Sequence, residues 1–414
     1  MPLTLSDKLK SLGVKVGARD LPPPQQKPTG YPIERVVPGR FVETPFGPTY
    51  VVENLYDATY RHGQVGLRPA TALQPIAAWA GEPYLADFDL EQFAFIDTET
   101  SGLAGGSGTY AFLIGAGRFE GDHFRLAQFF MRDPAEEPAQ LAALSDFLEP
   151  CQALVTFNGK SFDAPLLDAR YITRRGEKFP LIDAPHLDLL HLARRLWRDR
   201  LPSRRLGDLE REILGLERTE EDTPGWLIPT LYFTYLRDGD ARPLKGTFYH
   251  NALDVLAMAA LLNHTGQMLA DPLNEPVAHA LDLVAIGKLF EDLGEIELAI
   301  SLFEQGLGRN DLPEEHYWLT QQRLSFVYRR QGDYAAAVAV WEQAADGRQI
   351  YAHVELAKFY EHKQRDPAQA KQWTEVALSI VTGHHPHHPE RRQWLADLQH
   401  RLARLERKVA GKGD

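Results

Sequence analysis

The sequence of 414 residues contains a single cysteine, Cys151, and no apolar run long enough to cross a bilayer. One cysteine excludes an intramolecular disulfide and a cysteine-based zinc cage, and it is typical of a reducing compartment. A crossing needs about 18 consecutive apolar residues. The first residues, MPLTLSDKLKSLG, interrupt their apolar side chains with polar ones, unlike a signal peptide. We therefore expect a cytoplasmic protein that has no membrane partner.

Positive charge is also scarce, because 45 Lys and Arg residues stand against 57 Asp and Glu residues and leave a net charge of −12. This balance argues against a protein that coats nucleic acid through bulk positive potential. It still allows a nucleic-acid enzyme whose carboxylates hold divalent cations. Residues 170–205 form a candidate phosphate-binding patch, since ten Lys or Arg residues against four Asp or Glu residues give a local charge of +6. A solvated helix face is the alternative interpretation.

Composition divides the chain into four segments. Residues 1–34 predict a short amphipathic helix and then a proline-rich linker, because five prolines in residues 21–32 exclude regular structure. Residues 35–90 predict a β-rich lead-in with Gly and Pro turns. Residues 91–270 contain three successive strand-like runs and then alternating helix and strand patterns. That order predicts an α/β fold with a mixed sheet flanked by helices, as in the ribonuclease-H-like fold, although other α/β folds also fit.

Residues 275–410 predict only helices, and they contain three imperfect repeats. The segments GEIELAISLFEQGL, GDYAAAVAVWEQAA and RDPAQAKQWTEVAL align at Ala299, Ala337 and Ala370, with spacings of 38 and 33 residues. A small residue in every repeat, with a bulky one a turn later, suits helices that approach each other closely. The units resemble tetratricopeptide repeats. We expect this domain to bind a protein partner or to position the substrate.

The strongest local motif is IDTETSGL, residues 96–103. In a strand, the side chains of Asp97 and Glu99 project from the same face, close enough to share a cation. Two carboxylates at the end of a buried strand are costly unless something neutralises them, and a divalent metal does so. The alternative is that Asp97 caps a turn and Glu99 is solvated.

A glycine-rich loop, GLAGGSGTY, follows this motif. A backbone rich in glycine lets a nucleotide approach closely, so Thr100, Gly102 and Leu103 are predicted to contact the substrate. A flexible hairpin connection is the alternative. The loop is not a phosphate-binding P-loop, because no Lys-Ser or Lys-Thr pair follows it.

Two further acids lie in helical contexts. In VTFNGKSFDAPLL, a strand is expected to end at Asn158 and Asp163 falls in the first turn of the next helix, where it could simply complement the helix dipole. Asn158 and Lys160 are predicted to contact the substrate, Lys160 at the scissile phosphate. In FYHNALDVLAMAALL, Asp254 interrupts the apolar residues of a helix, and His250 lies one turn earlier on the same face. A histidine in a helix is more often a surface or satisfied core residue.

Together these carboxylates form the donor set of a two-metal phosphodiesterase. Mg²⁺ and Mn²⁺ select oxygen ligands, and two such ions about 3.5–4 Å apart activate a water and stabilise the leaving 3′-oxygen. Asp97 would bridge the two ions, and His250 would take the proton from the attacking water. The remaining ligands would be Glu99, Asp163 and Asp254, bound directly or through water.

These motifs, together with TYAFLIGAG, QFFMRDPAEE, HLDLLHLARRLW and PGWLIPTLYFTYL, resemble the YprB-type ribonuclease-H-like exonuclease domain of bacteria, a branch of the DEDD 3′-5′ exonucleases. The resemblance covers nearly all of residues 35–265, and appended tetratricopeptide-like repeats are a known arrangement in such proteins. It implies a ribonuclease-H-like core and metal-dependent nuclease activity on DNA or RNA. A structure-selective endonuclease and an inactive protein-binding scaffold are the alternatives.

The resemblance has one departure, at the general base. DEDD enzymes place a catalytic tyrosine four residues before the last aspartate, or a catalytic histidine five residues before it. Here His250 is four residues before Asp254 and Tyr249 is five residues before it. In a helix, a separation of four keeps His250 over Asp254, whereas a separation of five turns Tyr249 about 140° away. We predict that His250 is the base, with Tyr249 as the alternative.

A histidine-rich tract, GHHPHHPE, occupies residues 383–390. It looks like a metal-binding tract, but its two prolines deny the histidines a fixed spacing. We interpret it as a loop before the last helix.

Overall fold

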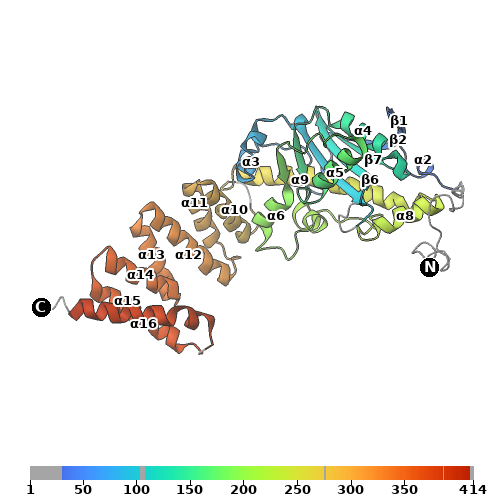
Figure 1. Cartoon of the computed structure of the whole chain (residues 1–414). Coiled ribbons are helices and arrows are strands. Elements are labelled where there is room, and N and C mark those ends of the chain that lie inside the picture. The colour runs from blue at the N-terminus through green and yellow to red at the C-terminus, as the bar shows by residue number, and fades with distance from the viewer. Residues whose placement is uncertain (1–29, 103–107, 275–276, 386, 411–414) are drawn as a thin grey trace, which may run out of the picture. The chain divides into compact units, whose positions relative to one another are not determined.

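The computed structural model describes residues 30–102, 108–274, 277–385 and 387–410 (Figure 1). The expected N-terminal helix, most of the proline-rich linker and Leu103 lie outside these residues. The chain divides into two compact units, each built from three segments. The first, here the sheet unit, comprises Met1–Arg68, Asp89–His186 and Ile213–Ala260. The second, here the helical unit, comprises Pro69–Phe88, Leu187–Glu212 and Leu261–Asp414.

A mixed sheet has the strand order β1-β2-β7-β6-β5-β8-β9. Neighbouring strands from β1 to β5 pair antiparallel, and β8 pairs parallel with β5. The predicted fold class, a mixed sheet flanked by helices and followed by an all-helical region, is confirmed. The strands are β1 (Arg40–Thr44), β2 (Gly47–Tyr56), β5 (Phe93–Thr100), β6 (Ala111–Glu120), β7 (His123–Phe130), β8 (Ala153–Thr156) and β9 (His186–Asp188), and a separate pair is β3 (Arg61–His62) and β4 (Val65–Gly66).

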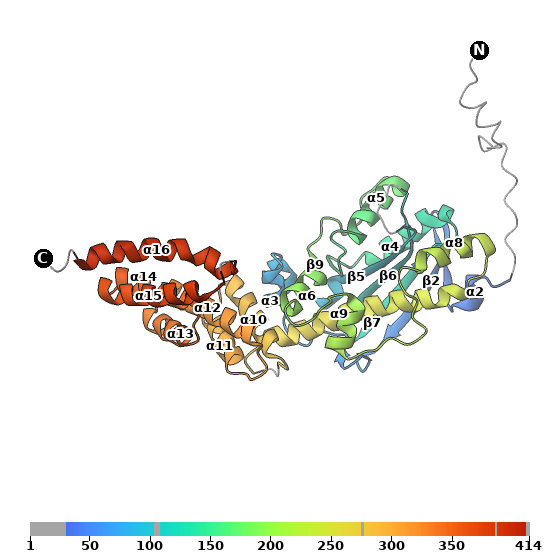
Figure 2. The same cartoon turned by 90° about the horizontal axis from the view of Figure 1, so that it is seen from below.

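Helices cover both faces of this sheet, with α4 and α5 on one side and α8 and the first half of α9 on the other (Figure 2). The apolar residues alternate along each strand, so successive side chains enter different layers. Ile96 of β5 packs in the layer with Leu144 of α4, whereas Phe112 of β6 stacks on Tyr232 of α8 with ring centroids 3.9 Å apart. The helices of this unit are α2 (Ile33–Val36), α4 (Glu137–Leu148), α5 (Asp163–Arg175), α8 (Ile228–Asp238) and the first part of α9 (Lys245–Ala270).

Two glycines on β6 let α9 lie close to the sheet. A Cβ atom at Gly115 would lie 2.4 Å from Oδ1 of Asn251, and one at Gly117 would lie 2.8 Å from a methyl carbon of Val255. Both distances are far below van der Waals contact, so only glycine fits at these two positions. The close approach brings Asn251 of α9 within hydrogen-bonding distance of Asp97 on β5.

A buried ion pair joins α4 to α5. Glu137 accepts hydrogen bonds from Nε and Nη2 of Arg170, both at 2.6 Å, and a third from Nε of Arg174 at 2.6 Å. The side chains of Glu137 and Arg170 are 2% and 8% exposed. A paired geometry of this kind compensates the cost of burying the two charges, and it fixes the helix whose first residue is Asp163.

The helical unit is built from helices that pack in sequence, α10 on α11, α12 on α13, α14 on α15 and α15 on α16. The aligned alanines Ala299, Ala337 and Ala370 are all fully buried. No helix among the described residues has both the length and the apolar character that a bilayer crossing requires. The helices are α3 (Gln74–Trp79), α6 (Leu189–Trp197), α7 (Leu206–Leu209), α10 (Ala280–Leu293), α11 (Ile296–Leu307), α12 (Glu314–Gln331), α13 (Tyr334–Asp346), α14 (Ile350–His362), α15 (Pro367–Gly383) and α16 (Pro389–Ala410).

Part of the basic patch predicted at residues 170–205 serves packing within the helical unit. Arg195, on α6, donates hydrogen bonds to the backbone of Lys288 and to the carboxylate of Asp292. Arg200 donates to Asp282 at 2.8 Å, and the Asp282 side chain is 7% exposed. These two arginines therefore hold α10 in place, and their charge is already balanced by acids of that helix.

Candidate active site

The last residues of β5 present two carboxylates toward α9. Residues 94 and 96 of β5 face α4 and α5, so Asp97 and Glu99 point to the opposite face. Nδ2 of Asn251, on α9, donates to Oδ2 of Asp97 at 2.8 Å and lies 3.3 Å from its backbone oxygen. The strand carries a register irregularity between Glu99 and Thr100, where its pairing with β6 ends. The two acids thus stand at the point where β5 leaves the sheet.

The other two acids reach this point from helices. Asp163 is the first residue of α5, and its Oδ1 accepts a hydrogen bond from the hydroxyl of Thr98 on β5. Asp254, on α9, accepts a hydrogen bond from the guanidinium of Arg218, which lies in the segment before α8. The side chains of Arg218 and Asp254 are 13% and 17% exposed.

Mutual electrostatic effects place the four carboxylates in one cluster. Burial, followed by the charges of Asp254, Glu99 and Asp163, raises the pKa of Asp97 well above its usual value. Burial and the charges of Asp254, Asp163 and Asp222 raise the pKa of Glu99 in the same way, and Arg218 opposes this shift. Buried carboxylates whose pKa is raised by neighbouring acids are a mark of a site that accepts positive charge.

His250 lies between two acids. Its Nδ1 lies 2.7 Å from an oxygen of Asp222, and its Nε2 lies 3.7 Å from Oδ2 of Asp254. The hydroxyl of Tyr249 instead accepts a hydrogen bond from Thr219 at 3.3 Å. The structure therefore turns His250, and not Tyr249, toward the last aspartate.

Arg218 competes with Asp222 for the same nitrogen of His250. Nη1 of Arg218 lies 3.2 Å from Nδ1. A guanidinium can only donate and a carboxylate can only accept, so the ring satisfies one or the other. The shorter contact, 2.7 Å to Asp222, favours a proton on Nδ1. Nε2 then carries the lone pair, which is the state that a general base requires.

The predicted substrate-binding residues flank the carboxylates along the chain. The hydroxyl of Thr100 donates to the backbone oxygen of Gly102 at 3.0 Å, which turns the chain just after Glu99. Asn158 has a φ of 69°, in the left-handed region, and Lys160 is exposed in the turn before Asp163. Leu103 lies outside the described residues.

Two exposed aromatic residues adjoin the site along the chain. Phe162, directly before Asp163, is 59% exposed, and Trp226 is 72% exposed. The preceding residue, Gly225, lies beside His250, since a Cβ there would stand 3.8 Å from Nε2. Exposed aromatic faces at a charged site are the feature on which unpaired nucleobases stack.

Arg218, Asp222 and Asn251 were not among the residues predicted from the sequence. Arg218 and Asp222 lie in the charged segment ERTEEDTPG, which has no periodicity and reads as a solvated loop. Their spacing of four residues did not distinguish them from the other charges. Asn251 did carry a signal, because it is a polar residue beside His250 in an otherwise apolar helix, and it is fully buried.

The donor set fits divalent cations that prefer oxygen. Four carboxylates suit Mg²⁺ or Mn²⁺, and burial together with the neighbouring negative charges raises the pKa of Asp97 and of Glu99. Arg218 supplies a positive charge, at Asp254. Within the described part of the chain, only His384, His388 and Glu390 bring three ligand atoms of this kind within 4.8 Å of one another.

Comparisons with known proteins agree with this architecture. Residues 94–265 match the family model described as the RNase_H superfamily, so the fold of this part of the chain is ribonuclease-H-like. The uncharacterized protein YprB of Bacillus subtilis (strain 168) is 34% identical over 322 residues, which make up 76% of this chain and 75% of that protein. The chain belongs to the family of YprB.

Proposed function

We propose that this protein is a divalent-metal-dependent 3′-5′ exonuclease that hydrolyses phosphodiester bonds of single-stranded DNA or RNA. The proposal rests on one observation, a cluster of four carboxylates from one strand and two helices beside His250. These carboxylates are Asp97, Glu99, Asp163 and Asp254. Superfamily membership supports nuclease chemistry. We also propose residues 91–270 as the nuclease domain, residues 275–410 as tetratricopeptide-like repeats and the cytoplasm as the location.

Several residues of this chain would each have a distinct role in catalysis. Two bound Mg²⁺ or Mn²⁺ ions would supply activation of the attacking water and stabilisation of the leaving 3′-oxygen. Asp97, Glu99, Asp163 and Asp254 would hold these ions. His250 would accept the proton of the water at Nε2, while Asp222 holds the proton on Nδ1 and so keeps the ring in its working orientation. Arg218, which pairs with Asp254, would also contact a phosphate oxygen of the substrate.

The aromatic rim supports a single-stranded substrate. Phe162 and Trp226 offer exposed rings next to Asp163 and His250, and stacking on such rings does not depend on the base. Bases that are already paired in a duplex cannot stack there. Lys160 and the backbone at Gly102 would hold the terminal phosphate and sugar.

The test uses 5′-labelled single-stranded DNA and RNA with Mg²⁺ or Mn²⁺. We expect a ladder that shortens from the 3′ end, and a rate that falls more than about 100-fold in Asp97→Asn. Asp122→Asn is the matched control, because Asp122 is exposed in the turn between β6 and β7. Discrete internal cuts would favour the endonuclease alternative. No metal-dependent cleavage of single strands, duplexes or junctions would leave the inactive scaffold.

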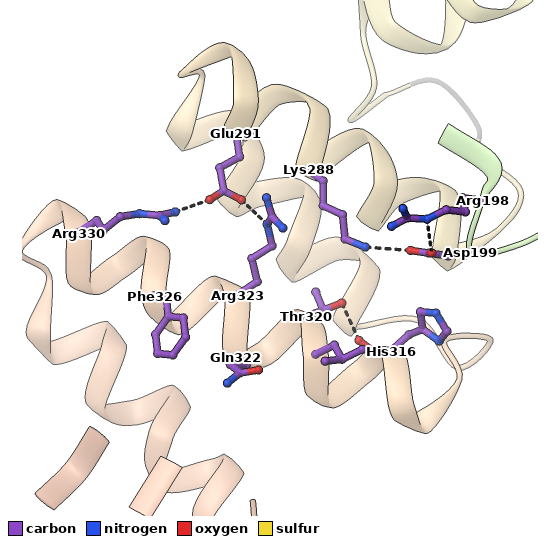
Figure 3. A pocket seen from close by; sticks show the side chains of 11 residues that line it. Arg198, Asp199, Lys288, Glu291, His316, Thr320, Gln322, Arg323, Phe326 and Arg330 are labelled. Atoms are coloured by element: carbon purple, nitrogen blue, oxygen red, sulfur yellow. Dashed lines mark hydrogen bonds and ion pairs between the residues drawn. The ribbon is translucent and has the colours of Figure 1, made fainter. Parts of the chain in front are cut away.

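We further propose that the helical unit binds an acidic segment of a partner protein. A cavity of about 540 Å³ lies between α10, α12 and the end of α6 (Figure 3). Arg323 and Arg330 both reach Glu291, and Nζ of Lys288 lies 2.9 Å from Asp199. With Arg198 added, four cations line the cavity against two acids.

Phe326 also lines this cavity, and the guanidinium of Arg329 already covers its ring at 4.7 Å from the centroid. Carboxylates suit this cavity, because its four cations outnumber its two acids. Fluorescence polarisation with poly-glutamate should detect binding that Arg323→Glu with Arg330→Glu abolishes. Preferential binding of single-stranded DNA would instead favour a substrate-positioning role.

A further inference from the structure

The histidine-rich tract has no part in the proposed nuclease activity. It joins the end of α15 at Gly383 to the start of α16 at Pro389, as the sequence predicted for a loop before the last helix. The structure nevertheless gathers three of its side chains. His384, His388 and Glu390 each direct one potential ligand atom to a common region, where these atoms lie within 4.8 Å of one another.

The distances suit a shared metal ion. Nε2 of His384 lies 3.4 Å from Oε2 of Glu390, and Nδ1 of His388 lies 3.9 Å from the same oxygen. A tetrahedral ion with bonds of about 2.0–2.1 Å to its ligands holds those ligand atoms about 3.3–3.4 Å apart. The first distance already meets this value, and the second needs a shift of about half an ångström.

The two imidazole nitrogens are also left unsatisfied. Nε2 of His384 and Nδ1 of His388 are shielded from solvent and have no hydrogen-bond partner among the described residues, although the side chains themselves are 31% and 41% exposed. The other two histidines of the tract differ, because Nδ1 of His385 accepts a hydrogen bond from the backbone of His387 at 3.3 Å.

The backbone around this cluster is held by α16. Arg391 donates to the backbone oxygens of Thr382 at 2.9 Å and His384 at 2.7 Å, and Arg392 donates to that of His387 at 3.0 Å. These bonds attach the backbone at Thr382, His384 and His387 to the start of α16. The spacing of the histidines is therefore set by tertiary contacts, which the sequence pattern could not reveal.

We propose that His384, His388 and Glu390 form a binding site for a transition-metal ion, with zinc as the best match. Two imidazoles and one carboxylate suit Zn²⁺, whereas Mg²⁺ prefers oxygen ligands alone. Three protein ligands leave a fourth position for water. The site is thus chemically distinct from the carboxylate cluster, and its ion would join the end of α15 to the first turn of α16.

Metal binding requires one local rearrangement. The rings of His384 and His388 are stacked, with centroids 4.2 Å apart and planes 8° from parallel. Lone pairs lie in the ring planes, and nearly parallel planes do not meet at one ion. One ring must therefore turn about χ2, a broad torsion that costs little to change.

The test is Zn²⁺ titration of the full chain by calorimetry, with Mg²⁺ in excess so that the carboxylate cluster is saturated. We expect one Zn²⁺ ion per chain and a rise in Tm on binding. The double variant His384→Gln with His388→Gln should lose both effects. The matched control, His385→Gln with His387→Gln, should keep them. With a chelator present, both variants should unfold at the temperature of the wild-type protein.

Co²⁺ gives a second readout that does not depend on stability. The wild-type chain and the control should show the intense visible absorption of four-coordinate cobalt, and the His384→Gln with His388→Gln variant should not. Equal losses in the two double variants would mean that the tract binds metal diffusely, which overturns the proposed site. So would the absence of any Zn²⁺ binding beyond the sites saturated by Mg²⁺.

Discussion

Nδ1 of His250 lies 2.7 Å from a carboxylate oxygen of Asp222, and this contact favours one tautomer of the ring. Because a carboxylate can only accept, the favoured tautomer has its proton on Nδ1 and a lone pair on Nε2. Nε2 faces Asp254, at 3.7 Å from its Oδ2. The basic nitrogen is therefore directed at the carboxylates where a metal-activated water would stand.

We expect Asp222→Asn to lower kcat by about 10-fold to 100-fold with little change in KM. An asparagine can present its NH₂ group to Nδ1, which stabilises the wrong tautomer while leaving the substrate contacts intact. Single-turnover cleavage of a labelled oligonucleotide measures the effect, and Asp222→Glu should restore part of the rate. An unchanged kcat in Asp222→Asn, at an unchanged Tm, would show that Asp222 does not position His250.

Replacement of Trp226, which is 72% exposed, should weaken substrate binding. Loss of one base–aromatic stack costs about 1–3 kcal/mol, so we expect Trp226→Ala to raise KM for single strands about 5-fold to 100-fold with a smaller effect on kcat. Trp226→Phe should retain most of the affinity. Tyr84→Ala is the control, since Tyr84 is similarly exposed, at 71%, and belongs to the helical unit. Equal KM values for Trp226→Ala and the wild type would exclude stacking at this position.

Loss of the Glu137 carboxylate should destabilise the sheet unit. Glu137→Gln leaves the guanidinium of Arg170, 8% exposed, without a counter-charge. The free energy of unfolding should fall by about 3 kcal/mol. Urea denaturation measures this change, and the exposed Glu149→Gln should stay within about 0.5 kcal/mol of the wild type. A change of that small size in Glu137→Gln would mean that Arg170 finds another partner.

Acid should weaken the packing of α16 on α14. Burial alone would raise the pKa of Glu361, but hydrogen bonds from Lys408 and Arg404 hold it below its usual value of 4.5. A carboxyl whose pKa is lower in the folded state stabilises the fold above its unfolded pKa, and this stabilisation is lost as the pH falls through the folded value. The Tm difference between wild type and Glu361→Gln should therefore be largest near neutral pH and shrink below pH 4.5. A difference that does not vary with pH would contradict this linkage.

The alternation of apolar residues in FAFIDTET was enough to predict a strand that carries Asp97 and Glu99 on one face, and in the structure this is the face toward α9. In helices and strands the side-chain direction repeats at a fixed interval, so the periodicity of the sequence predicts which face each side chain occupies. Asp222 and Arg218 lie in a loop, where no period relates sequence to direction, and only the folded chain shows that they meet His250.

In the helical unit, too, the sequence predicted the packing of residues in a repeated pattern but not the partners of isolated charged residues. Ala299, Ala337 and Ala370 were aligned from the sequence, and all three are buried, because small residues mark close helix contacts. The arginines of residues 170–205 could not be assigned in that way. Whether Arg195 meets a phosphate or Asp292 depends on a helix nearly a hundred positions further along the chain.

The lack of space beside Gly115 restricts which residue pairs can occur at positions 115 and 251. A Cβ there would stand 2.4 Å from Oδ1 of Asn251, so the glycine and the asparagine that donates to Asp97 can be inherited only together. Among relatives of this chain, a larger residue at the first position should accompany a shorter one at the second. Such pairs would mark lineages in which the aspartate has lost this hydrogen-bond donor.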